Sequence, residues 1–309
     1  MTDDCYFNEN NMRHLRTAAA RMEAGQTIVM KDVDDMERKA KIINTIRQFR
    51  LIDDTYFNMF MEDNIPCMEL FLRLILSNPT LRVERIQTQR EVSNIFGRSV
   101  RFDVFTRNDD GTLCNMEVQR SDQEATPERA RFNSCMLDML TIKKGFTWGE
   151  NHLPPACVIF ITEHDVLRGG KPIYHISRRI DELEEKRFED NAQIIYVNAS
   201  YQDESPLGWL MHDMFANSPE KMHYGILADR TNYLKTDTHG VMKMCELMEK
   251  LMEEDRAKSF EKGREAEQQS TILRLFQRGW KLPDIMDATN LEKEKILNFL
   301  RANGIQPAQ

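Results

Sequence analysis

The segment Val100–Ser121, VRFDVFTRNDDGTLCNMEVQRS, decides the fold expected for this chain. It predicts two strands joined by a turn, because the NDDG sequence between them supplies residues that tolerate positive φ. Side chains along a strand alternate between its two faces, so Glu117 and Gln119 point to the same side. If the strands pair around the turn, Asp103 can face that side as well. Two carboxylates that converge on one strand face form a hard-oxygen site suited to Mg²⁺ or Mn²⁺.

An ordinary alternative explains the same polar residues without a metal. Polar alternation is common on a strand with one solvated face. In that case Asp103 lies at a sheet edge, and Glu117 forms a salt bridge with Arg101. The sequences on either side of the two strands resemble those of a known family, described next, and that resemblance favours the metal site over this alternative.

These residues carry a resemblance to a known family. Asp103, a turn of about a dozen residues and then Glu117-Val118-Gln119 resemble the PD-(D/E)xK nuclease pattern, with Gln119 where that superfamily usually has lysine. More narrowly, the sequences RFDV and NMEVQ are similar to those of the Rpn-type recombination-promoting nucleases, also called PD-(D/E)xK family transposases. The similarity covers roughly residues 50 to 235. It extends to three flanking segments: Asp53–Phe57 and Met68–Leu70, which resemble the family's first helices, and Arg129–Phe132, which resembles the helix after the second catalytic strand.

The resemblance implies an α/β fold, in which helices flank a restriction-endonuclease-like central mixed sheet. The apolar runs Ala156–Thr162 and Ile194–Asn198 are typical of strands buried on both faces of such a sheet. We expect a further strand within residues 81–95, and pieces at the sheet edge over Ile173–Ile176 and Ile180–Leu183. Apolar spacing predicts helices over residues 10–50, 51–61, Cys67–Leu76, Pro127–Leu140 and 205–228.

The chain divides into three expected regions: an N-terminal helical segment (residues 1–50), a nuclease-like domain (51–235) and a helical C-terminal appendage (236–309). Residues 241–269 are a charge-rich helical pattern typical of a solvated connector. The end, Thr271–Leu300, is expected to form two or three short helices, and the sequence GWKLPDIMDATNLEKEKILNFL within it resembles a helix-turn-helix. From Ser270 onward the chain has six Lys and Arg and four Asp and Glu, a net charge of +2, which leaves −10 for the remainder. This tail could contact DNA, or it could be a helical packing unit or a protein-interaction tail.

The resemblance implies a DNA endonuclease that depends on Mg²⁺ or Mn²⁺. Asp103 and Glu117 are the expected catalytic metal ligands, and the carbonyl of Val118 completes the metal shell. A metal held there lowers the pKa of a bound water and polarises the phosphate. Gln119 is the third catalytic residue; its amide can hydrogen-bond the water or a phosphate oxygen but supplies no positive charge.

Three further residues are candidates for the site. An acid on the helix over residues 67–76 joins the metal site in the resembled family, so Glu69 is a candidate ligand; alternatively it is an exposed carboxylate favoured by the helix macrodipole. Arg131 could contact phosphate with its planar guanidinium, or form a surface ion pair. Arg101, within the RFDV sequence, is the second candidate for binding substrate.

Composition limits the function classes. The 309 residues are 41% hydrophobic and 30% charged, which are globular values. No apolar run approaches the roughly 20 residues of a membrane helix, so no membrane partner is expected. Six scattered cysteines without a CxxC pair favour a reducing cytoplasm over a disulfide framework or a zinc knuckle. The sequence has no G-x-S-x-G elbow, P-loop or G-x-G-x-x-G motif.

The net charge of −8 leaves alternatives open, because DNA binders usually gather Lys and Arg on one face. One alternative is a nuclease-fold protein that has lost catalysis and serves as a DNA- or protein-binding module. Another is a transcription factor that acts through residues 270–301. For the nuclease, DNA is the expected partner. A homodimer is compatible with it, because two active sites related by a two-fold axis cut both strands most simply.

Overall fold

The computed structural model describes residues 30–93, 99–121, 124–142, 145–148, 152–184 and 186–305, with side chains from residue 37 onward. The predicted helical residues 10–29 lie outside the described residues. Within the described ranges, no helix combines the length and the apolar character that a membrane crossing needs.

A six-stranded mixed sheet lies at the centre of the fold, in the order β1-β2-β3-β4-β8-β5. Strands β3, β4 and β8 are parallel to one another, and the remaining pairs are antiparallel. Every residue of β3 and β4 is buried, which explains the continuous apolar run of β4. The strands are β1 (Val83–Val92), β2 (Val100–Asn108), β3 (Leu113–Gln119), β4 (Ala156–Thr162), β5 (Ile173–Ile176) and β8 (Ala192–Asn198).

The turn between β2 and β3 fixes which residues stand opposite one another. Gly111 has a φ of 86°, in the left-handed region that glycine adopts without strain. The resulting register pairs Val104 with Met116. One position further along, Asp103 and Glu117 stand opposite each other, as the sequence pattern predicts.

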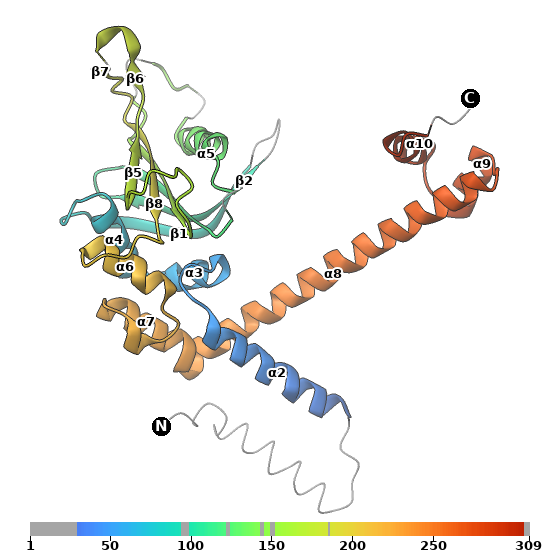
Figure 1. The fold of residues 1–309 in the computed structure, drawn as a ribbon, viewed down its shortest axis with the longest axis horizontal. Helices are drawn as coiled ribbons and strands as arrows, with labels where there is room; N and C mark the ends of the chain where they lie inside the picture. Colours follow the sequence, from blue (N-terminus) through green and yellow to red (C-terminus); the bar gives the residue numbers. More distant parts are fainter. Residues whose placement is uncertain are drawn as a thin grey trace, which may run out of the picture. The chain divides into compact units, whose positions relative to one another are not determined.

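Helices cover both faces of the sheet (Figure 1), with α5 on one side and α3, α4, α6 and α7 on the other. Ala130 and Leu137 of α5 share a core with Val158, Phe160 and Tyr196 of the sheet. The predicted α/β class, with helices flanking a mixed sheet, is confirmed. The helices of this part are α2 (Met30–Gln48), α3 (Asp54–Met61), α4 (Ile65–Ile75), α5 (Pro127–Met139), α6 (Pro206–Phe215) and α7 (Gly225–Thr236).

Two segments differ from their predictions. Ile180–Leu183 does not lie at the edge of the main sheet: β6 (Arg179–Ile180) pairs with β7 (Lys186–Arg187) in a separate two-stranded sheet, and η2 (Asp181–Leu183) is a 3₁₀ turn. The helical run predicted over 205–228 is divided into α6 and α7 by a connection that contains η3 (Pro219–Lys221). Pro219 favours the interruption, because a proline disfavours helical geometry at the preceding residue, and Ser218 is extended with a ψ of 148°.

The chain forms two compact units, the first ending at Cys245 and the second beginning at Glu246. The boundary lies inside α8 (Thr238–Gln277), ten residues after the position that the sequence suggested. In the second unit, the end of α8 packs with α9 (Leu282–Thr289) and α10 (Lys293–Ala302). Their core consists of Ile272, Leu275, Ile285, Ile296 and Leu300.

Candidate functional site

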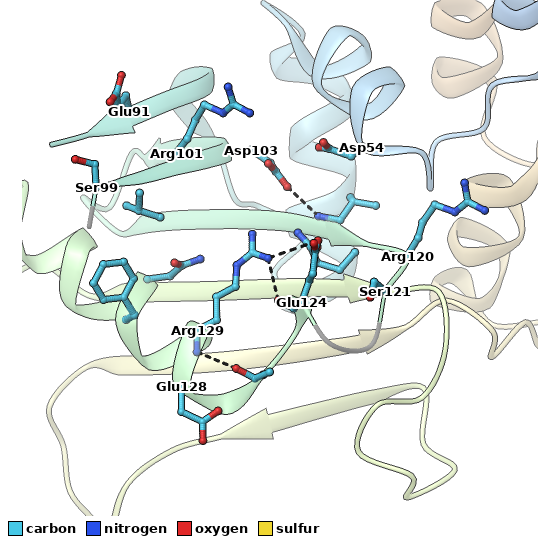
Figure 2. Close-up of a pocket in the computed structure, with 16 residues that line it drawn as sticks. Asp54, Glu91, Ser99, Arg101, Asp103, Arg120, Ser121, Glu124, Glu128 and Arg129 are labelled. Atoms are coloured by element: carbon cyan, nitrogen blue, oxygen red, sulfur yellow. Dashed lines mark hydrogen bonds and ion pairs between the residues drawn. The ribbon is translucent and has the colours of Figure 1, made fainter. Parts of the chain in front are cut away.

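A pocket of about 1090 Å³ opens where β2 begins and β3 ends, which is one end of the sheet because these strands are antiparallel. Its lining comes from the first residue of α3, from the end of β1, from both of these strands and from the first half of α5. Figure 2 shows Asp54 and Asp103 beside this pocket, with the side chain of Arg129 reaching toward it from α5.

Asp103 is buried at the wall of the pocket, with 7% of its surface exposed. The backbone N–H of Val118 donates to its Oδ2 at 3.4 Å. Burial raises the pKa of Asp103 well above its ordinary value, and the negative charges of Glu117 and Asp54 raise it further. The alternative that puts Asp103 at a sheet edge is wrong, because β2 lies between β1 and β3.

Glu117 has no exposed surface and is held by three side chains. Asn115 Nδ2 donates to its Oε1 at 2.9 Å, and Arg129 Nη2 and Gln119 Nε2 donate to its Oε2 at 2.9 and 3.5 Å. Burial raises the pKa of Glu117, while the bond from Asn115 and the charge of Arg129 lower it. The alternative salt bridge with Arg101 is therefore wrong: the partner of Glu117 is Arg129.

Arg129 lines the pocket, whereas Glu117 is not among its described lining residues. The start of α5 fixes Arg129: the Thr126 hydroxyl caps the helix by accepting from the Arg129 backbone N–H at 3.3 Å. Arg129 Nη1 also donates to the carbonyl of Glu124 at 2.9 Å. The guanidinium is thus one of the groups that separate the Glu117 carboxylate from the pocket.

Asp54 is the acid that the sequence analysis did not single out. It is the first residue of α3, at the mouth of the pocket, and its Oδ1 accepts from Asn58 Nδ2 at 2.6 Å. The loss of hydration beside neighbouring protein atoms raises its pKa, and the charge of Arg101 lowers it. The available signal was the Asp53-Asp54 pair at the start of a helix; Asp53 itself is taken up in ion pairs with Arg50 and Arg120.

The structure does not bring Glu69 to this pocket. Its Oε1 accepts from the Val83 N–H at 3.0 Å, and its Oε2 pairs with Arg73 at 2.5 Å. Val83 pairs with Asn108, five residues from Asp103 along β2, a separation of about 16 Å. Glu69 is also only 8% exposed, so it differs from the exposed carboxylate of the alternative prediction.

The other predicted site residues divide into two groups. Val118, Gln119 and Arg101 line the pocket. Arg131, the predicted phosphate contact, is exposed and lies outside the described lining. The arginine of α5 that lines the pocket is Arg129. The charged lining is mixed: five acids, Asp54, Glu91, Asp103, Glu124 and Glu128, and three arginines, Arg101, Arg120 and Arg129.

Comparison with known proteins identifies the matched part of the chain. A family model described as PD-(D/E)XK nuclease family transposase matches residues 50–205, just over half of the chain. This span contains every residue that lines the pocket, together with Glu117. No curated protein and no solved structure matches the chain.

Proposed function

The chain belongs to the PD-(D/E)XK nuclease family transposases, and from that membership we propose that it is a DNA endonuclease that hydrolyses phosphodiester bonds with Mg²⁺ or Mn²⁺. The observation that carries the proposal is that Asp54 of α3 and Glu117 of β3 lie near enough to the buried Asp103 of β2 for their negative charges to raise its pKa. The pKa values of all three are raised, because burial and neighbouring negative charges disfavour their ionised forms. A divalent cation would offset this repulsion.

The donor set fits such a cation. Carboxylate oxygens are the ligands that Mg²⁺ and Mn²⁺ prefer. Among the three carboxylates, the ion pair that the structure describes is the one between Glu117 and Arg129. We assign the metal to Asp103 and Glu117, with the Val118 carbonyl and the Asp54 carboxylate as further ligands. When bound, the metal supplies an activated water and stabilises charge on the phosphate.

The remaining polar residues of the pocket are proposed to bind the DNA and to orient the attacking water. The Gln119 amide, at the end of β3, is proposed to hydrogen-bond the attacking water or a phosphate oxygen. Arg129 can exchange Glu117 for a phosphate, because its planar guanidinium suits both partners. Arg101 lines the same pocket and is proposed to contact the DNA backbone. We give the phosphate contact to Arg129 in preference to the exposed Arg131.

The biological setting follows from the narrower resemblance to the Rpn-type proteins. We propose a role in recombination, transposition or the biology and defence of mobile elements. Two copies related by a two-fold axis would place one pocket on each strand of a duplex. Sedimentation of the protein with and without duplex DNA measures this directly: a dimer is expected at least in the complex.

Plasmid nicking and linearisation test the proposed activity. Purified protein is assayed with Mg²⁺, Mn²⁺, Ca²⁺ or EDTA, alongside Asp103→Asn, Glu117→Gln and the control Asp109→Asn in the exposed turn. Cleavage is expected with Mg²⁺ or Mn²⁺ only, and each substitution of a proposed metal ligand should reduce its rate by on the order of 1000-fold or more. Cleavage that survives both of these substitutions would place the active site elsewhere.

A second candidate function is a catalytically silent binding module. Acids outnumber arginines in the pocket lining, and Arg129 already occupies Glu117. On this alternative, the wild-type protein binds DNA or a protein but cuts no DNA form with any of these metals. Asp103→Asn would then leave binding unchanged.

A further inference from the structure

A second group of metal-binding side chains lies at the connection between α6 and α7, away from the carboxylate pocket. His212 and Asp213 belong to the last turn of α6, and His223 precedes the start of α7 by two residues. One ligand atom from each of the three lies within 4.8 Å of the others. These residues do not occur in the described lining of the Asp103 pocket.

Asp213 is fully buried and is anchored by the backbone at the start of α7. Its Oδ2 accepts from the N–H groups of His223 and Tyr224 at 3.0 and 2.9 Å. The His223 N–H also reaches Oδ1, at 2.8 Å. These bonds fix the orientation of the carboxylate and are sufficient by themselves to join the two helices.

The two histidine rings are an addition that this structural role does not need. Nδ1 of His223 and Nδ1 of His212 lie 3.1 and 3.3 Å from the same Oδ1 of Asp213. With the backbone N–H of His223, three nitrogen atoms crowd an oxygen that has about two lone-pair sites. A cation among these atoms resolves the crowding, because each Nδ1 then presents a lone pair instead of competing as a donor.

The separations fit a four-coordinate transition metal. Zinc lies about 2.0–2.2 Å from nitrogen and oxygen ligands, so two ligands of a tetrahedron are about 3.3 Å apart. The two Nδ1-to-Oδ1 distances are close to this value. Imidazole nitrogen selects Zn²⁺, Ni²⁺, Co²⁺ or Cu²⁺ over Mg²⁺, and two histidines with one carboxylate are a known zinc donor set.

We propose that His212, Asp213 and His223 form a binding site for Zn²⁺ or a similar transition-metal ion, separate from the proposed nuclease centre. The histidine side chains are 42% and 41% exposed, so ions reach the site from solvent and a water can take the fourth position. The bound ion joins the end of α6 to the start of α7 and stabilises that connection.

A tryptophan beside the cluster provides the readout. The ring of Trp209 stacks on His223 with centroids 5.7 Å apart and an interplanar angle of 4°. Co²⁺, a spectroscopic substitute for Zn²⁺, quenches the fluorescence of a tryptophan so close to it. Tag-free, chelator-treated full-length protein is titrated with Co²⁺, and Zn²⁺ is then added as competitor. Saturable quenching that Zn²⁺ reverses is expected, and Trp209→Phe should remove the quenching while visible Co²⁺ absorption persists.

Matched variants assign the site. His212→Gln and His223→Gln change partly exposed side chains and leave the backbone anchors of Asp213 in place. Each should weaken Co²⁺ binding by at least about 100-fold, because loss of even a supporting partner costs roughly 10- to 100-fold. His164→Gln, at an exposed histidine, should bind as the wild type does. Asp103→Asn, in the carboxylate pocket, removes a ligand of the proposed nuclease centre, and it should leave the Co²⁺ quenching of Trp209 unchanged.

Two results would overturn the proposal. The first is wild-type protein that shows no saturable Co²⁺ or Zn²⁺ binding up to millimolar concentration. The second is binding in both histidine variants that equals that of the wild type. Thermal unfolding with Zn²⁺ or EDTA adds an independent measure: Zn²⁺ should raise the melting temperature of the wild type and leave that of His212→Gln unchanged. If His212→Gln changes the melting temperature by the same amount with Zn²⁺ as with EDTA, the three residues form hydrogen bonds only and bind no metal.

Discussion

Asp103 is held in the folded protein at an energetic cost, because it is buried beside Glu117 and near Asp54. Its pKa in the folded state is raised above its ordinary value, so the folded state binds the proton more tightly than the unfolded state. Between those two pKa values the free energy of unfolding falls as pH rises. A carboxylate kept under such conditions is typical of a site where function is retained at the expense of stability.

The substitution Asp103→Asn should therefore stabilise the protein in EDTA near neutral pH. The substitution removes the charge and keeps an acceptor for the Val118 N–H. It should therefore raise the free energy of unfolding by about 1 kcal/mol, which corresponds to a rise in melting temperature of roughly 2–4 °C. The difference should vanish at a pH below the ordinary aspartate pKa, where both states of the wild type are protonated. Calorimetry of the two proteins measures this, and a lower melting temperature for the variant would contradict it.

At this scale the sequence predicts part of the site. Strand alternation and the NDDG turn are sufficient to place Asp103 opposite Glu117, since both are local properties of the chain. Asp54 could not be found in that way, because its position depends on how α3 packs against the sheet. The sequence favours Glu69 as a further ligand, but the arginine four residues later and the N–H of Val83 hold Glu69 elsewhere.

Helix α5 supplies both a wall of the pocket and a competing cation. The cap at Thr126 presents Arg129 to Glu117, where it occupies an oxygen that we assign to the metal. The proposed metal binding would therefore have to break an ion pair between a fully buried carboxylate and an arginine. We propose that the released guanidinium then contacts a phosphate.

Replacing Arg129 with alanine should separate metal binding from catalysis. Above neutral pH, Mn²⁺ affinity should rise about tenfold, because a charged hydrogen bond worth roughly 1.5 kcal/mol no longer competes. Plasmid cleavage should fall, since the phosphate contact is lost. Calorimetric titration with Mn²⁺ and cleavage rates measure the two effects, and Arg131→Ala, an exposed arginine on the same helix, is the control. A weaker Mn²⁺ affinity in Arg129→Ala would refute the competition.

Helix α7 is joined to its neighbours by a buried lysine. Lys235 is 6% exposed, and its Nζ donates to the carbonyls of Arg47, Phe49 and Asn217. Burial lowers its pKa from 10.5 to about 8. Between these two pKa values the unfolded state holds the proton and the folded state does not, so the contribution of this group to stability rises with pH.

The substitution Lys235→Met should lower the free energy of unfolding by about 3 kcal/mol, because three backbone carbonyls lose the donor that the buried amine provides. Relative to the variant, the wild type should gain further stability as pH rises from about 8 to 10.5. Urea unfolding across this range measures both effects. Lys243→Met, at an exposed position of α8, should change little, and a similar loss there would show that the effect is not specific to the buried amine.

Among the elements, prediction succeeds where pattern alone determines structure. The apolar runs of β4 and β8 specify buried strands, and the turn fixes the β2–β3 hairpin. The segment Ile180–Leu183 carries the apolar residues of a strand, but the two-residue strands β6 and β7 pair with each other away from the main sheet. Which partner a short strand takes depends on contacts outside the segment, so its composition does not reveal it.

At the scale of the whole molecule, the second compact unit has its own core around Ile272, Ile285 and Ile296. Ile296→Ala, at a fully buried position, should destabilise it by about 2–4 kcal/mol. Amide hydrogen exchange should show lost protection in the end of α8, in α9 and in α10, with β3 and β4 unaffected. Loss of protection in the sheet would show that the two units unfold together. A parallel fall in DNA affinity would assign DNA contact to this tail.

The order of strands in the sheet also determines when the protein becomes competent during its synthesis. Both carboxylates of the β2–β3 hairpin have left the ribosome's catalytic centre by Gln119, but the neighbouring strands β4 and β8 end only at Thr162 and Asn198. At 5–20 residues per second, the interval between Gln119 and Asn198 lasts roughly 4 to 16 s. A nascent or prematurely terminated chain thus carries the acidic residues without the sheet that positions them. The coding order would therefore delay the proposed cutting activity until most of the first unit has been translated.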